Sequence, residues 1–126
     1  LEARPGDVLA RRRMAFLERR SGRPLEALRH LEVALASNPS DVGLLTEHGL
    51  TLGQAARLRE AETALRKAIA AAPNYAPAHE GLGQVLLAAG RSAEAADAFR
   101  RALELDPSLT RARRGLAEAT RGTTGP

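Results

Sequence analysis

The sequence predicts an all-α fold, an α-solenoid of antiparallel helix pairs with about seven helices. Three prolines, Pro39, Pro73 and Pro107, stand 34 residues apart. The residues before each proline recur at the same interval, in the columns Ala27/Ala61/Ala95, Leu31/Leu65/Phe99 and Ala34/Ala68/Ala102. Aromatic residues make up only 2% of the 126 residues, so the core must form from alanine and leucine on closely packed helices. Such a repeat is typical of a solenoid, whose units bury their apolar faces only against their neighbours.

The first two units are each expected to form two helices. The first unit predicts helices at about 7–20 and 24–37, with Pro24 near a helix start, where its missing N–H costs nothing. The same spacing of apolar residues predicts helices at about 41–54 and 58–72 in the second unit.

The third unit repeats this plan. Asn74 is expected to cap a helix that ends at Gly90, and the hydroxyl of Ser92 is expected to cap the next helix, which stops before Pro107. One further amphipathic helix follows at about 108–121, without a partner helix after it.

The third unit resembles the tetratricopeptide repeat (TPR) family at nearly every defining place, through Gly81-Leu82-Gly83, Leu86, Gly90, Ala95, Phe99, Ala102 and Pro107. The second unit matches through Gly49, Leu52, Ala61, Leu65, Ala68 and Pro73. The resemblance implies a right-handed superhelix of repeats 8–41, 42–75 and 76–109, a capping helix 110–121, a terminal arm 1–7 and a linker-like tail 122–126. Ala15, Gly49, Gly83 and Ala117 share one register, where a small residue would let the second helix of each pair come close.

Composition limits the classes of function. Cysteine is absent, so neither disulfides nor thiolate metal sites are expected. No apolar run approaches the roughly 18 residues of a membrane span, which predicts a soluble protein compatible with the cytoplasm, although the compartment stays open. The start at Leu1 and the turn-prone end suggest a piece of a longer chain, and the high Ala, Arg and Gly content is typical of a GC-rich bacterial genome.

The resemblance implies that the first helix of each pair lines a concave groove, and helical spacing selects the residues of that stripe. With Met14 and Leu17 turned inward, the groove is predicted to contain Arg12, Arg13, Phe16, Arg19, Thr46, Glu47, Leu50, Gln54, Glu80, Gln84, Leu87, Arg111 and Arg114. Phe16 and Leu50 occupy equivalent places and either form an anchor pocket for a partner or complete the packing between units. Phe16 with Arg12 and Arg19 is the preferred hot spot.

The predicted function is a non-enzymatic protein-interaction module that binds a peptide or a helix of a partner. The alternative is the substrate-recruiting portion of a larger enzyme or of a secretion or assembly complex. The net charge of +4 favours an acidic protein partner over nucleic acid, because few aromatic side chains are present to stack on bases. Self-association through the solenoid ends is a third option. The places where some TPR domains clamp a chaperone's C-terminal carboxylate read Arg12, Phe16, Glu47, Pro77 and Gly81, so that ligand is not predicted.

The three histidines are the remaining candidates for chemistry. His30, His48 and His79 are too far apart in sequence for a helical metal pair, and no catalytic residue, metal site or cofactor is predicted. We expect the rings to be structural. A buried neutral histidine would make stability fall on acidification.

Overall fold

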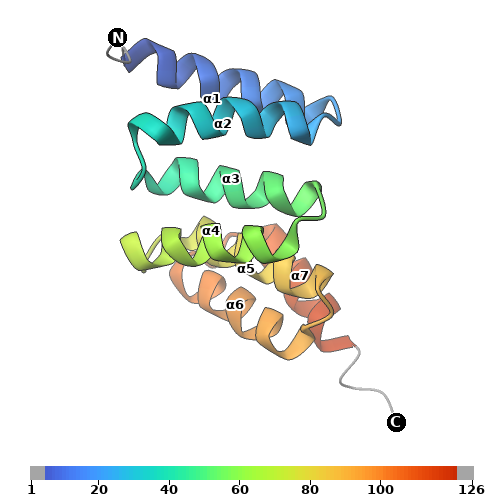
Figure 1. Ribbon diagram of the computed structural model, residues 1–126. Helices are drawn as coiled ribbons and strands as arrows, with labels where there is room; N and C mark the ends of the chain where they lie inside the picture. Colours follow the sequence, from blue (N-terminus) through green and yellow to red (C-terminus); the bar gives the residue numbers. More distant parts are fainter. Residues whose placement is uncertain (1–4, 122–126) are drawn as a thin grey trace.

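The computed structural model describes residues 5–121, which form seven α-helices and confirm the predicted fold class. Three antiparallel pairs are followed by a single last helix (Figure 1). The helices are α1 Pro5–Arg20, α2 Pro24–Ser37, α3 Val42–Gln54, α4 Leu58–Ala71, α5 Ala76–Ala88, α6 Ser92–Leu105 and α7 Thr110–Arg121.

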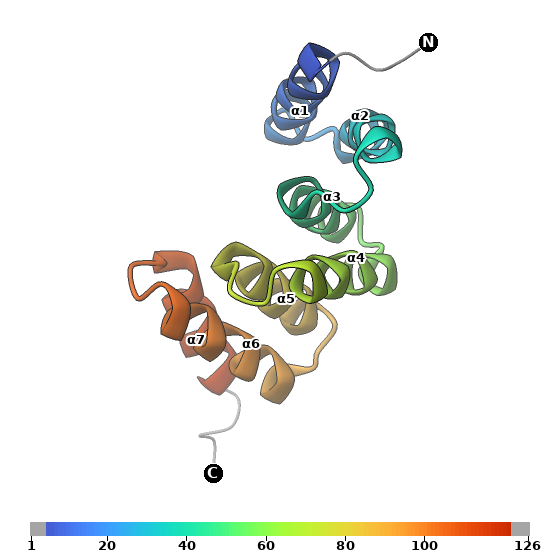
Figure 2. The same ribbon diagram turned by 90° about the vertical axis from the view of Figure 1, so that its left-hand side faces the viewer.

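The helix pairs stack along one axis and curve. Each second helix packs against its own first helix and against the first helix of the next pair. Figure 2 shows α1, α3, α5 and α7 along the inner side of the curve and α2, α4 and α6 along the outer side. The α1–α3 pair makes far less backbone contact than α3–α5 or α5–α7, so the first pair stands more openly from the rest.

The repeated columns form the core, as the period predicts. Leu31, Leu65 and Phe99 are at most 1% exposed, and all members of the two alanine columns are buried. The largest apolar cluster runs from Leu28 in α2 to Ala119 in α7, while a smaller cluster holds the first pair together. Each unit therefore completes its core only with its neighbours.

Glycines let the helices come close around two large side chains. A Cβ atom on Gly49 would lie 2.5 Å from Leu65 Cγ, and one on Gly83 would lie 2.7 Å from Phe99 Cε1. The prediction that Ala117 fills this place in the last helix was wrong, because Ala117 is exposed. Gly115 faces Phe99 instead, and a Cβ atom on Gly115 would lie 2.3 Å from Phe99 Cζ. Residues in the register of Ala117 face the second helix of their own unit. Within residues 5–121 no second helix follows α7.

The turn between the two helices of each pair has the same backbone geometry in all three units. In the third unit, Gly90 donates its N–H to Leu87 O and Arg91 donates to Leu86 O, the two hydrogen bonds of a Schellman motif. Gly90 has φ +79°, and its counterparts in the first two units are Gly22, with φ +78°, and Ala56, with φ +63°. Ala56 therefore holds a left-handed conformation that favours glycine.

Several helix boundaries differ from the prediction. The residue before α5 is Tyr75 rather than Asn74, and α6 starts at Ser92 after Arg91, with no side-chain cap at either helix. Among helices α2 to α6, the N-cap side chain of α3 accepts a hydrogen bond, from Leu44 N to Asp41 Oδ1 at 3.0 Å, and the other four have no side-chain cap. α1 begins at Pro5, so the end of the predicted arm 1–7 is helical, whereas residues 1–4 and the predicted tail 122–126 lie outside the described residues.

Candidate functional site

The inner side of the curve brings the first and last helices within electrostatic reach. Burial lowers the pKa of Arg19 in α1; Glu47 in α3 opposes that shift, and Arg111 in α7 adds to it. Residues almost the whole chain apart thus face one concave space. This face is the candidate functional site.

In the N-terminal half of this face, long polar side chains bridge the open gap between α1 and α3. Arg12 donates hydrogen bonds to both carboxylate oxygens of Glu47, at 2.5 and 3.4 Å, and Glu47 raises the pKa of Arg12. Two turns further along these helices, Arg19 Nε donates to Gln54 Oε1 at 3.0 Å. These four predicted groove residues bond to one another, so they hold the first pair to the second.

In the C-terminal half, four predicted residues line one hollow between α5 and α7. Gln84 and Leu87 from α5 and Arg111 and Arg114 from α7 surround a volume of about 420 Å³. Neither arginine forms an ion pair within residues 5–121, so both charges are free to meet a ligand. Sequence reasoning missed Glu118, which lines the same hollow and lies 34 residues after Gln84, so the period itself could have found it.

Glu80 is a partly buried acid beside this hollow. Burial raises its pKa, while Arg111 and a backbone hydrogen bond from Ala112 oppose the rise. The carboxylate therefore offsets part of the positive charge at the α5–α7 end.

The remaining predicted groove residues have other surroundings. Thr46 is only 3% exposed and donates its hydroxyl to Val42 O, so it presents no surface to a ligand. Leu50 is half-buried and lies against Gly81, which favours the packing reading for this residue. Phe16 is 54% exposed, with the guanidinium of Arg20 5.6 Å from its ring centroid.

The outer, N-terminal face of α1 is apolar, contrary to the expectation that Met14 and Leu17 turn inward. Their side chains are 45% and 53% exposed, and with Leu9 and Arg13 they line a separate hollow of about 460 Å³. Arg13 therefore belongs to this face and not to the concave one. The counterparts of Leu17 in later units, such as Val85, are buried against the preceding second helix, and α1 has no such helix before it within residues 5–121.

The histidines lie apart. His79 is 9% exposed, with Nε2 2.8 Å from Pro73 O, and Nδ1 of His30 lies 3.2 Å from Arg11 Nη1. His48 is half-buried between α2 and α4. Within residues 5–121 there is no group of three or more His, Asp or Glu side chains that could hold a metal ion. No helix in the same range is long and apolar enough to cross a membrane.

Comparison with solved structures finds the same architecture elsewhere. A Thermobaculum terrenum O-GlcNAc transferase mutant matches with a TM-score of 0.86 and 33% identity over 91% of this chain, which spans 22% of that protein's chain. The first TPR of Spaghetti (RPAP3), bound to an HSP90 peptide, matches with 0.87 and 19% identity, covering 99% of each chain. The second TPR domain of human RPAP3, in complex with an HSP70 peptide, matches with 0.81 and 18% identity, over 91% of this chain and 96% of that one.

Stacked helix pairs with a lined inner face define the class of α-solenoid interaction proteins. A comparison with curated proteins finds no match. The family model for the tetratricopeptide repeat matches residues 46–110, and the chain belongs to the tetratricopeptide repeat family.

Proposed function

We propose that the concave face binds a peptide or a helix of a partner protein, with the hollow between α5 and α7 as its centre. The observation that carries the proposal is that Gln84, Leu87, Arg111 and Arg114 converge on this hollow, where neither arginine forms an ion pair within residues 5–121. Apolar surface beside unpaired arginines is typical of residues that dominate interface energetics. The peptide complexes of two structural neighbours support the same use of the fold.

The partner segment proposed here is acidic. Arg111 and Arg114 outweigh Glu118 at the hollow, and the whole chain carries a net charge of +4. Complementary charge raises association rates mainly at low ionic strength. A nucleic acid is the weaker candidate, because few aromatic side chains are present to stack on bases.

Chaperone C-terminal peptides are not proposed as ligands, although two neighbours bind them. The places that form the clamp hold Arg12, Phe16, Glu47, Pro77 and Gly81, and Arg12, the only cation among them, already pairs with Glu47. A free carboxylate would have to displace Glu47.

The module itself is proposed to be non-catalytic. The alternative role, recruiting a substrate for a larger enzyme or an assembly complex, is supported by the partial match to the O-GlcNAc transferase, whose chain is several times longer. Both roles require the same concave face to bind a protein segment.

The test is a selection of random heptapeptides displayed on phage, followed by affinity measurement on variants. Arg111→Glu with Arg114→Glu should weaken acidic peptides by at least about tenfold, since charge reversal adds repulsion to the lost attraction. Arg29→Glu with Arg100→Glu, the same double charge reversal on the exposed sides of α2 and α6, is the matched control and should change little. Equal affinity for the concave variant and the control would refute the site.

Self-association through the N-terminal end is a second candidate, supported by the exposed Leu9, Met14 and Leu17. Clustered exposed apolar side chains mark interaction surfaces. Light scattering over a concentration series should show a mass that rises for the wild type and stays monomeric for Met14→Glu with Leu17→Glu. A wild type that remains monomeric at all concentrations removes this candidate.

A further inference from the structure

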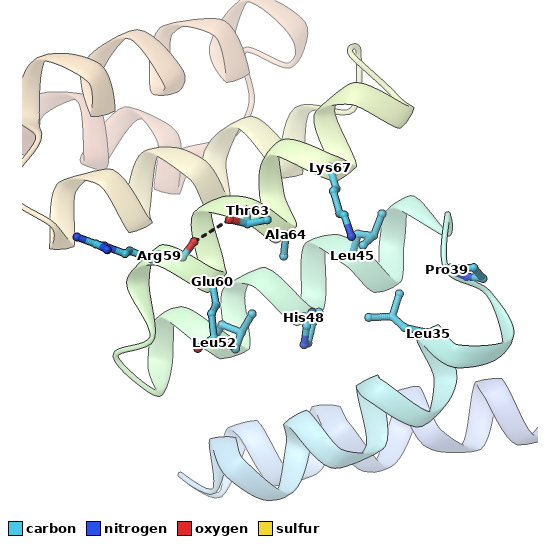
Figure 3. A pocket seen from close by; sticks show the side chains of 10 residues that line it. All are labelled: Leu35, Pro39, Leu45, His48, Leu52, Arg59, Glu60, Thr63, Ala64 and Lys67. Carbon is cyan, nitrogen blue, oxygen red and sulfur yellow. Dashed lines mark hydrogen bonds between the residues drawn. The ribbon is translucent and has the colours of Figure 1, made fainter.

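A pocket of about 460 Å³ lies on the outer side of the solenoid, away from the concave face. Leu35 in α2, Leu45 and Leu52 in α3 and Ala64 in α4 form its apolar walls. Figure 3 shows the side chain of His48 in the middle of the pocket, with Lys67 beside Leu45 at one end and Glu60 beside Leu52 at the other. The volume falls within the range of about 300–1,000 Å³ that is usual for binding pockets.

The next unit contains an equivalent hollow between α4 and α6, which serves as an internal control. Its lining residues lie 34 positions later, in the pairs Leu35/Ile69, Leu45/His79, His48/Leu82, Leu52/Leu86, Ala64/Ala98 and Lys67/Arg101. The two hollows therefore differ by side chains and not by architecture.

In the equivalent hollow, the polar groups are satisfied within the protein. Arg91 in α6 donates to Glu62 in α4 at 2.7 Å and to Glu94 at 2.7 and 2.9 Å, which ties the two outer helices together. The single histidine there, His79, has a backbone carbonyl 2.8 Å from its Nε2. These polar side chains therefore need no external ligand as a hydrogen-bond partner.

The first pocket lacks these internal partners. Leu28 stands at the place of Glu62, so Arg57, the counterpart of Arg91, finds no acid on the neighbouring outer helix. Within residues 5–121, neither Lys67 nor Glu60 forms a hydrogen bond or an ion pair through its side chain. The rim charges are available for an external ligand.

His48 gives the second, independent observation. Its Nε2 atom is buried and has no hydrogen-bond partner among the described residues. The nearest acid is Glu32, whose Oε2 lies 3.9 Å away, beyond hydrogen-bond distance. Burial lowers the pKa of His48 against the opposing effects of Glu32 and Glu60, so the ring is neutral near pH 7. A buried polar atom without a partner is rare in a folded protein and calls for an explanation.

We propose that this pocket is a second binding site, which takes a large apolar side chain of a partner peptide together with a neighbouring carboxylate. The apolar side chain lies against Leu35, Leu45 and Leu52. The carboxylate accepts a hydrogen bond from Lys67, at the end of the pocket away from Glu60, and lies near the ring of His48.

A peptide suits the pocket better than a free small molecule. The pocket is open along the gap between α2 and α4, so one side of a small ligand would stay in water. A side chain presented by a partner is covered on that side by the partner's own surface. The site lies on the outer side of α3 and does not depend on the concave groove.

The experiment selects a random heptapeptide phage library against the full chain and measures each enriched peptide on four proteins: wild type, Lys67→Glu, Arg101→Glu and Arg111→Glu. Arg101 is the counterpart of Lys67 in the equivalent hollow, so it is the matched control. We expect a class of peptides that share an apolar residue beside an acidic one and lose at least about tenfold in affinity on Lys67→Glu alone. Binding of such a peptide should also raise the pKa of His48, followed by NMR of its ring protons.

The His48→Leu variant should fold like the wild type, because leucine already occupies the equivalent position, Leu82, in the next unit. This variant should keep its circular dichroism spectrum and bind the same peptides more weakly. If no enriched peptide depends on Lys67, including the case in which nothing enriches, the proposal is overturned. Peptides that depend only on Arg111 would support the concave groove and reject this site. Octanoate that shifts the His48 resonances without any Lys67-dependent peptide would assign the pocket to a small amphiphile and reject the peptide.

Discussion

Replacing Gly83 by alanine is expected to destabilise the protein, because Phe99 occupies the space that the added methyl group needs. The new Cβ would lie 2.7 Å from Phe99 Cε1 and 2.9 Å from Cζ. The ring has little room to move away, since Gly115 in α7 also packs against it so closely that a Cβ there would lie 2.3 Å from Cζ. Phe99 is 1% exposed and has no free direction in which to turn.

Two opposing effects set the magnitude. Alanine is favoured over glycine inside a helix by about 0.8–1.0 kcal/mol, whereas forcing a methylene into a packed core costs about 1–3 kcal/mol. The net loss for Gly83→Ala is therefore about 1 kcal/mol, and Gly83→Leu should lose more. Gly53→Ala is the matched control, because its Cβ would lie 3.4 Å from Val85 Cγ2, an ordinary contact. That variant should gain about 0.5–1 kcal/mol.

Urea denaturation followed by circular dichroism measures both variants in the same assay. We expect the midpoint to fall for Gly83→Ala and to rise for Gly53→Ala, with unchanged slopes. Adding Phe99→Leu should reduce the penalty of Gly83→Ala, because the smaller side chain leaves room for the methyl group. A Gly83→Ala protein as stable as the Gly53→Ala protein would show that α5 and α6 do not pack through this contact.

Four further predictions follow from particular contacts. His48→Leu should raise the free energy of unfolding by about 1 kcal/mol, because it removes an unpaired buried nitrogen. Since the folded-state pKa of His48 is lowered, the unfolded state binds more protons, so wild-type stability should fall between about pH 7.5 and 5.5 and the variant should show a flatter profile in thermal melts. Ala56→Gly should gain about 1 kcal/mol in the same melts, because Ala56 has φ +63°. Arg91→Ala should lower the thermal midpoint only slightly, because its side chain is exposed, and the loss should shrink at high salt. Deleting residues 110–121 should expose Phe99 and cause aggregation detected by light scattering, and a monomeric, fully helical truncation would contradict the capping role of α7.

The period predicted the packing well, because each buried column appears three times in the sequence. A single alanine such as Ala61 says little, but its repetition at Ala27 and Ala95 can be explained by a helix contact that every unit shares. The register of Ala15, Gly49 and Gly83 failed at Ala117, because it presupposes a following helix. The caps were predicted less well, since Asn74 and Ser92 have suitable side chains but lie one residue away from the N-cap positions.

The concave residues were only partly predictable. Helical spacing placed Gln84, Leu87, Arg111 and Arg114 on one side of their helices, and the stacking brings them to one hollow. Spacing alone could not show that Arg12 bonds to Glu47, because that contact depends on the width of the gap between α1 and α3. The exposure of Met14 likewise depends on what lies before α1 and not on the helix itself.

The internal bonds change which part of the groove is best suited to binding. Helical spacing predicts a groove that is basic at its N-terminal end and again near Arg111 and Arg114, with Arg12 and Arg19 in the preferred hot spot. Arg12 neutralises Glu47, and Arg19 bonds to Gln54, so a ligand would have to break these bonds before it could use either arginine. Each break would leave a partner group without its hydrogen bond, which reduces the net gain from binding. Within the part of the chain that the structure describes, Arg111 and Arg114 have no ion pair to give up, and this difference in cost favours a binding centre between α5 and α7.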